Sequence, residues 1–305
     1  MTPRILIPSL ALALLAGCAA PYRSALAPAA IPQMSNTSGV VAVAQHEIGT
    51  SINSSNMAGA AGGGILFALV DAAVNANTAK KTERFAADLR QSLLGFHFAE
   101  NAARQLGARF APGEGRPFAL ATVVAAQDKT DADLAALVAQ ASGDAVLVVF
   151  PKYFLDPQFT YIVVSADVVV CAKGAGLRKL ATEQRFGKAQ VPILYRNGFQ
   201  TTWGLPASSQ PADNKRENNI AAWAANDGQA TRDALAAACT EIAAMVQWDL
   251  AQPAKETYKA ADKATTAMAM VYYEGAHLPI RGNQVHASDG RIWVQNVDGR
   301  LYGLR

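Results

Sequence analysis

The stretch GDAVLVVF, residues 143–150, decides the fold of this 305-residue chain. Its last six residues are uninterrupted apolar side chains, and Gly143 and Asp144 precede them. A short apolar run of this kind is typical of a strand that is buried in a sheet. The sequence therefore predicts a layered protein built around a buried strand at 145–150.

Strands and helices alternate on both sides of this run. Before it, we expect a strand at 118–125 and a helix at 131–141. After it, we expect a long strand at 158–172 and another at 191–195. Asn197-Gly198, between ILYR and FQTTW, is the strongest short hairpin signal in the chain. Each of these strands is short enough to belong to one compact sheet, with the helix packed against it.

A long helix is expected over residues 219–250, with a break or cap at Asn226-Asp227-Gly228. Four apolar residues form its buried stripe: Leu235, Cys239, Ile242 and Val246. The order of the elements predicts an α/β fold, in which a mixed sheet is packed by this long helix near the carboxyl end.

The first residues of the chain have the pattern of a secretory signal peptide. Arg4 precedes an apolar stretch that is too short to span a bilayer, and Leu15-Ala16-Gly17-Cys18 closes it. This ending is similar to the lipobox of bacterial lipoproteins. The resemblance implies cleavage after Gly17 and acylation of Cys18 with diacylglycerol and palmitate, which is enough for stable anchoring. Ala19 and Ala20 follow, without an aspartate, which in that family implies the outer membrane with the body in the periplasm.

Residues 57–79 are rich in small side chains. Two rows recur at a spacing of four residues, which lets another backbone approach closely: Gly59 and Gly63, and Ala60, Gly64, Ala68, Ala72 and Ala76. The stretch resembles the glycine-zipper segments of envelope lipoproteins. We expect a helix packed on a sheet or on the next helix, with oligomerisation and membrane insertion as alternatives; Asp71 and Asn75 argue against a lipid-facing span.

Cys171 and Cys239 remain as a candidate disulfide in the oxidising periplasm. Alternation along the long strand places five apolar residues on one face: Ile162, Val164, Ala166, Val168 and Val170. Cys171 falls on the opposite face, whereas Cys239 lies on the stripe that seeks the apolar face. The sequence therefore favours two free thiols over a bridge.

These signals divide the chain into five segments. They are a signal peptide at 1–17, a lipidated cysteine and proline-bearing tether at 18–38, a strand and glycine-rich helical arm at 39–116, the α/β domain at 117–252, and a linker with a β-rich tail at 253–305. In the tail, Asp289-Gly290 and Asp298-Gly299 predict turns in a small terminal meander.

Few residues suggest chemistry. The four histidines, at 46, 97, 277 and 286, are widely spaced, and neither a CxxC motif nor a phosphate loop is present. The formal charge of +3 is too small to favour nucleic acid. We therefore expect a protein that is not an enzyme and that needs no cofactor or metal.

The segment 117–250, with GDAVLVV and the long helix, resembles the small α/β domains of envelope-assembly lipoproteins, such as the curli-secretion lipoprotein and the amino-terminal domain of the Tol–Pal propeller protein. The resemblance implies a structural or assembly component of the cell envelope that acts through protein–protein contacts or self-association. Two alternatives stay open. One is a peptidoglycan- or glycan-binding module that uses five aromatic residues, Tyr195, Phe199, Trp203, Trp223 and Trp248. The other is a periplasmic hydrolase with an unrecognised site.

Overall fold

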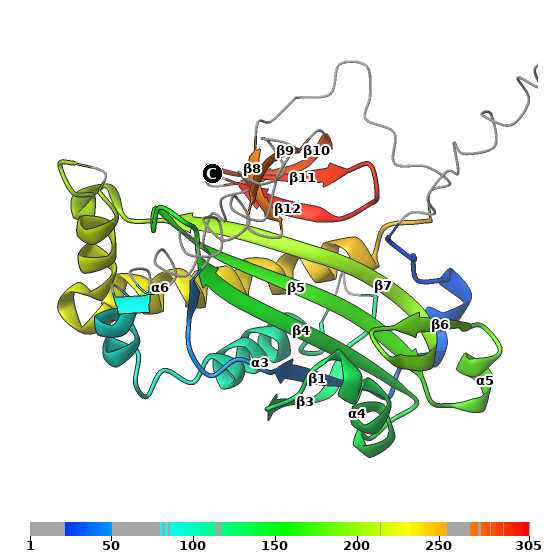
Figure 1. The fold of residues 1–305 in the computed structure, drawn as a ribbon. Coiled ribbons are helices and arrows are strands. Elements are labelled where there is room, and N and C mark those ends of the chain that lie inside the picture. Colours follow the sequence, from blue (N-terminus) through cyan, green and yellow to red (C-terminus); the bar gives the residue numbers. More distant parts are fainter. Residues whose placement is uncertain are drawn as a thin grey trace, which may run out of the picture.

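The fold is α/β, with one large mixed sheet and helices packed against it (Figure 1). A computed structural model describes the chain over residues 22–50, 80, 83–84, 86–113, 117–213, 215–254, 269–273, 276–280, 282–288 and 290–304. The sheet contains ten strands, of which eight follow one another in the order β10-β11-β12-β7-β5-β4-β1-β3. β2 (Gly49–Thr50) also pairs with β4, and β6 (Thr182–Phe186) with β7.

Three long antiparallel strands form the middle of the sheet: β4 (Ala145–Leu155), β5 (Tyr161–Ala172) and β7 (Ala189–Gly204). The apolar run at 145–150 opens β4, as the sequence predicts. β1 (Thr37–Val43) lies parallel to β4, and β3 (Leu120–Gln127) lies parallel to β1 at the end of the sheet. All seven residues of β1 are buried, because the sheet is covered on both faces there: Val41 and Val43 lie in one core, and Val40 and Ala42 lie in another.

Two helices cover one face of the sheet. They are α3 (Phe98–Arg109), which follows a turn at Gly95, and α6 (Arg216–Leu250). The largest core lies between them and the sheet, and it contains the whole apolar face predicted for the long strand, from Ile162 to Val170. A smaller core lies on the opposite face under α4 (Leu134–Gln140) and β6. The mixed sheet packed by a long helix is therefore confirmed.

α6 is kinked at the predicted break. Asn226, Asp227 and Gly228 all have positive φ, at 52°, 57° and 70°. Trp223, which lies just before the kink, is buried, and its indole N–H donates to the carbonyl of Phe159 at 2.8 Å. The kink turns the first part of the helix toward the turn between β4 and β5, where Phe159 accepts this hydrogen bond. In the described part of the chain, no helix is both long and apolar enough to cross a membrane.

Three sequence expectations need correction. Asn197-Gly198 is not a hairpin turn, because β7 continues through it and pairs with β5 along its length. The tether at 18–38 is not free beyond residue 21, because Leu26, Ala30 and Met34 are buried in the main core. A 3-10 helix, η1 (Pro28–Gln33), carries part of this segment onto the sheet.

The tail is β-rich as expected, but it is not a separate unit. β12 (Leu301–Leu304) pairs in parallel with β7, and β11 (Arg291–Asn296) and β10 (Gly282–Ser288) extend the sheet from there. β8 (Ala269–Tyr273) and β9 (Ala276–Ile280) form a two-stranded hairpin. The predicted segments 39–116, 117–252 and 253–305 thus all contribute strands to one sheet, so these boundaries do not separate domains.

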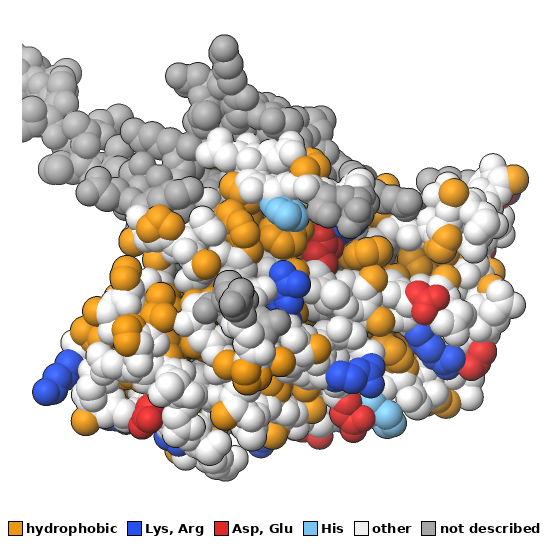
Figure 2. Space-filling view, turned by 180° about the vertical axis from the view of Figure 1, so that it is seen from behind, with side chains coloured by type: hydrophobic (Ala, Val, Ile, Leu, Met, Phe, Trp, Pro, Cys, Tyr) orange, Lys and Arg blue, Asp and Glu red, His pale blue; other side chains and the backbone are white. Residues whose placement is uncertain are grey.

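Remaining elements are short. They are η2 (Asp131–Asp133), α5 (Ala175–Arg178) and η3 (Ala207–Ser209). Seen from behind, charged side chains are few and lie apart among hydrophobic ones, so the described residues on that side form no large patch of one charge (Figure 2).

Candidate functional site

The described chain enters the sheet at its first residues. Ser24 forms a two-way backbone bridge with Arg196 of β7, with N···O distances of 2.8 and 3.0 Å. The amide of Arg23 donates to the carbonyl of Asp298, in the turn before β12, at 3.1 Å. The segment thus fills the gap along β7 between β6 and β12. Ser24 is thus joined to the sheet by a β-bridge, and Arg23 is bonded to the turn beside it.

Arg23 reaches the carboxyl end of α6 and is buried there with Asp249. Its Nε donates to both oxygens of the Asp249 carboxylate at 2.9 and 2.8 Å, and both side chains are fully buried. The same carboxylate accepts from the hydroxyl of Tyr195 at 2.7 Å and from the amide of Asn197 at 3.0 Å. A buried charge needs such partners, because desolvation is costly. This network locks the start of the chain to the long helix.

Tyr22 is held on the opposite face of the sheet. Its ring lies between two guanidinium groups, that of Arg196 at 4.0 Å and that of Arg300 at 3.9 Å from the ring centre. Its hydroxyl donates to Asp167 at 2.6 Å. Burial and the Asp167 carboxylate raise the pKa of the Tyr22 phenol above its usual range, so the donor stays protonated. We call Tyr22, Arg196, Arg300 and Asp167 the Tyr22 clamp.

Gly198 makes room for this clamp. A Cβ at this position would lie 3.1 Å from Nε and 3.2 Å from Cδ of Arg300, whose side chain crosses β7 there. Asn197-Gly198, whose sequence is typical of a hairpin turn, therefore lies inside a continuous strand, and each of its residues makes a specific contact there. Asn197 joins the buried Asp249 network, and Gly198 lets Arg300 reach Tyr22.

A groove crosses the same face of the sheet beside the clamp. It consists of two adjoining hollows of about 400 and 310 Å³, which share Lys152 and Asp167. The smaller hollow is lined by polar and charged groups that include Ser165, Gln200 and Arg300. The larger one continues toward β1, the Thr130 turn and Phe186. We call this feature the cross-sheet groove.

A second buried network attaches the tail. Arg291 of β11 pairs with Glu241 of α6, and the indole N–H of Trp293 donates to the same carboxylate at 3.1 Å. The Arg291 guanidinium also lies 4.4 Å from the ring centre of Trp203. The helix α6 therefore holds both the start and the end of the described chain.

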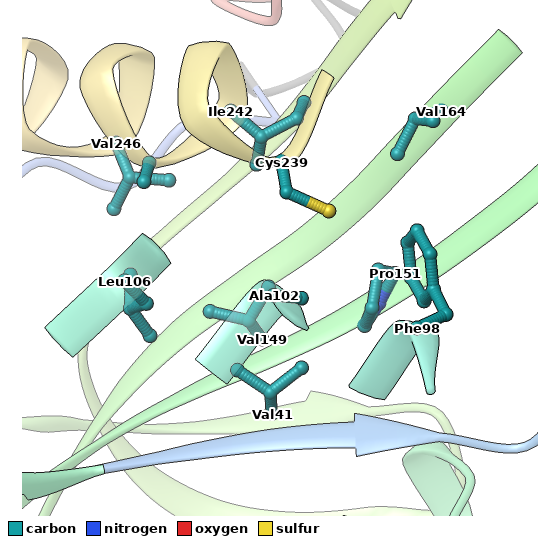
Figure 3. Close-up of a pocket in the computed structure, with 11 residues that line it drawn as sticks. Val41, Phe98, Ala102, Leu106, Val149, Pro151, Val164, Cys239, Ile242 and Val246 are labelled. Atoms are coloured by element: carbon teal, nitrogen blue, oxygen red, sulfur yellow. The ribbon is translucent and has the colours of Figure 1, made fainter. Parts of the chain in front are cut away.

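The candidate disulfide is not formed. Cys171 and Cys239 are free thiols, buried in the cores on opposite faces of the sheet. Burial raises the pKa of each thiol to about 12, so both stay protonated and unreactive at neutral pH. Cys239 points into an apolar space between α3, α6 and the sheet, with Phe98, Leu106 and Val246 among its neighbours (Figure 3). This space has a volume of only about 20 Å³, room for about one water molecule.

The aromatic cluster predicted for glycan binding is not a surface platform. Tyr195, Phe199 and Trp223 are buried in the main core, and Trp203 and Trp248 are partly buried against it. The sequence could not show this, because α6 covers the face of β7 that carries Tyr195, Phe199 and Trp203, and α6 itself carries the other two rings.

β3 is the last strand of the sheet and has a neighbour on one side only among the described residues. Its sequence, LATVVAAQ, contains no charge and no proline, and Val124 is 52% exposed. A hollow of about 320 Å³ lies beside it, lined by Gly39 of β1, Thr122, Val124 and Ala126 of β3, and Leu137 of α4. Natural proteins usually protect such an edge with charges, prolines or bulges. The pairing of β3 with β1 shifts its register once, between Leu120 and Thr122, and is regular from there to Gln127.

The remaining candidates are not brought together. His46 pairs with the exposed Asp128, His286 lies against Trp293 with the two rings tilted, and His97 precedes α3. In the described ranges, no three His, Cys, Asp or Glu side chains form a metal-ligand group. Cys18 and the small-residue rows from Gly59 to Ala76 lie outside the described residues.

Sequence reasoning missed the residues that build the clamp and its anchor, Tyr22, Arg23, Asp167, Asp249 and Arg300. One signal was present: Asp167 is a polar residue on a strand whose other face is wholly apolar. The chain matches no protein-family model, and comparisons with curated proteins and with solved structures find no match.

Proposed function

We propose that this protein is a lipoprotein of the outer membrane, anchored through Cys18, with its body in the periplasm, and that it serves as an interaction component of the cell envelope. The lipobox supports the anchor. One structural observation carries the rest: Tyr22, only four residues after Cys18, is already held on the sheet by the Tyr22 clamp.

The short link limits how far the body reaches from the membrane. A fully extended chain advances at most about 3.6 Å per residue, so four residues span about 14 Å. The sheet-bound residues 22–24 therefore keep the Tyr22 clamp close to the lipid surface. An anchored protein of this kind presents a fixed face to the bilayer and its other faces to partners.

The edge of β3 supports contact with a protein. An extended segment that adds to a free strand edge gains main-chain hydrogen bonds, and neighbouring hollows select its side chains. The hollow beside Val124 is lined mostly by small side chains, among them Gly39, Ala126 and Ser142, so it suits a small side chain of the added segment. We propose that the partner is a protein that supplies one such extended segment.

Membrane fractionation and mass spectrometry test the anchor. The mature protein is expected to carry acyl chains on Cys18 and to fractionate with the outer membrane, and Cys18→Ser is expected to release it into the periplasm. Retention of the Cys18→Ser protein in the membrane, or an unmodified Cys18, would refute the anchor.

Pull-down from the native envelope tests the edge. Val124→Lys places a charge at the middle of β3 and is expected to remove the partner, since an edge charge blocks strand addition. Leu94→Lys is the matched control, because Leu94 is equally apolar and 67% exposed at another site. Equal recovery of the partner with both variants would show that β3 is not the contact. Sedimentation of the Val124→Lys protein with purified sacculi would instead favour the glycan-binding alternative.

A further inference from the structure

We infer that the polar part of the cross-sheet groove binds the phosphate of an anionic phospholipid head group. The inference rests on the proposed anchor, and it assigns a ligand to a site that the anchor does not itself need. The site consists of the hollow of about 310 Å³ lined by Lys152, Ser165, Gln200 and Arg300.

The charges at this end of the sheet favour an anion. Lys152, Arg300 and Asp167 line the hollow, Arg196 lies over the Tyr22 ring beside it, and Asp298 pairs with Arg300, which makes three cations and two carboxylates. Arg300 pairs with Asp298 through one nitrogen, Nη1, at 3.1 Å. Asp167 is occupied by the Tyr22 hydroxyl. Among the described residues, Lys152 and Arg196 form no ion pair with a carboxylate. The three cations and two carboxylates together carry a net charge of +1, which an anion would neutralise.

The groove also offers the donors that a phosphate needs. Lys152 is exposed on β4, and its ammonium group is a compact point charge. Arg300 also lines the hollow, and its guanidinium has further N–H donors besides the Nη1 that bonds Asp298. The clamp stacks this guanidinium on Tyr22. A hollow of about 310 Å³ is large enough for a head group.

The position of the groove identifies the source of the phosphate. Tyr22 contacts Asp167 and Arg300, and both line the groove. Residue 22 is four residues from the acylated cysteine, so the anchor holds this site within about 14 Å of the lipid surface. The head groups of the anchoring membrane are therefore the phosphates that the site meets at the highest concentration.

Vesicle flotation of the unacylated mature chain, residues 18–305 with Cys18→Ser, tests the site without help from the anchor. The protein is expected to float with phosphatidylcholine vesicles that contain phosphatidylglycerol, and not with phosphatidylcholine alone. Lys152→Glu is expected to weaken binding about fivefold or more, since one basic residue near the surface is worth about 1 kcal/mol. Lys179→Glu, the same charge change at an exposed site on another element, is the matched control and is expected to have a smaller effect.

A second variant separates a site from general attraction to a charged surface. Ser165→Leu fills the hollow without changing the charge, and it is expected to weaken vesicle binding as Lys152→Glu does. Unchanged binding with Ser165→Leu, or equal losses with Lys152→Glu and Lys179→Glu, would overturn the inference. Calorimetric binding of inorganic phosphate without vesicle binding would overturn the assignment to lipid. None of these outcomes depends on whether Cys18 is acylated, which fractionation measures separately.

Discussion

Replacing Arg23 with methionine removes the cation from a fully buried ion pair. Methionine keeps the length of the apolar stem, so the change isolates the guanidinium. That group makes two bonds to the Asp249 carboxylate and three to main-chain carbonyls at the end of α6, those of Asp249, Gln252 and Pro253, at 2.7 to 3.1 Å. Removing one partner of a buried pair leaves an uncompensated charge and costs about 3–5 kcal/mol.

Urea unfolding of the mature protein measures this cost. Arg23→Met is expected to lower the free energy of unfolding by about 3–5 kcal/mol. Arg178→Met, at an exposed site on α5, is the control and is expected to stay within about 0.5 kcal/mol of the parent. The double variant Arg23→Met/Asp249→Leu is expected to lose less than the sum of its two single variants, because no lone charge remains. A loss below about 1 kcal/mol for Arg23→Met would refute the claim that the start of the chain is locked to α6.

Three further predictions concern buried groups and glycines. Because the pKa of Cys171 and Cys239 is about 12 in the folded state, above the ordinary 9.0, their contribution to stability is complete below pH 9 and is lost as the pH rises toward 12. The urea concentration at the unfolding midpoint should therefore decrease as the pH is raised from about 8 to about 10.5. Alanine at both positions should make this decrease smaller. A midpoint that does not change with pH would contradict the burial of the two thiols. Gly198→Ala is expected to displace Arg300 and cost about 1 kcal/mol in the same assay, and no loss would show that the Arg300 side chain does not need the space. Gly228→Ala, at φ 70°, is expected to cost about 1–2 kcal/mol, whereas a neutral effect would mean that the kink of α6 can relax.

The sequence predicted the sheet where apolar patterns are unambiguous. The run at 145–150 became the buried start of β4, and the alternation from Ile162 to Val170 identified the face that α6 covers. The opposite placement of Cys171 and Cys239 followed from the same alternation. These features depend on local periodicity, which a sequence shows directly.

Features that depend on distant partners could not be predicted. Asn197-Gly198 has the local signature of a turn, but β7 continues through it in its pairing with β5. The side-chain partners of the two residues, Asp249 and Arg300, lie 52 and 102 residues further on. The segment from residue 22 has the proline-rich composition of a linker. Its buried positions recur every four residues, but the prolines between them mask this pattern: Leu26, Ala30 and Met34.

The tail shows the same limit. Its turns at Gly290 and Gly299 were visible in the sequence, and both glycines have positive φ. The pairing of Leu301 with Phe199, which joins the tail to the main sheet, has no local signal. β12, which lies between β11 and β7, joins the sheet through tertiary contacts that only the fold reveals.

Hydrogen exchange over residues 22–34, read by mass spectrometry, measures whether the start of the body is held on the sheet. We expect the amides of Arg23 and Ser24, which donate to Asp298 and Arg196, to exchange as slowly as those of β5. Complete exchange of this segment within seconds would show instead that it is a free tether, and the proposed attachment of residues 22–24 to β7 and α6 would be wrong.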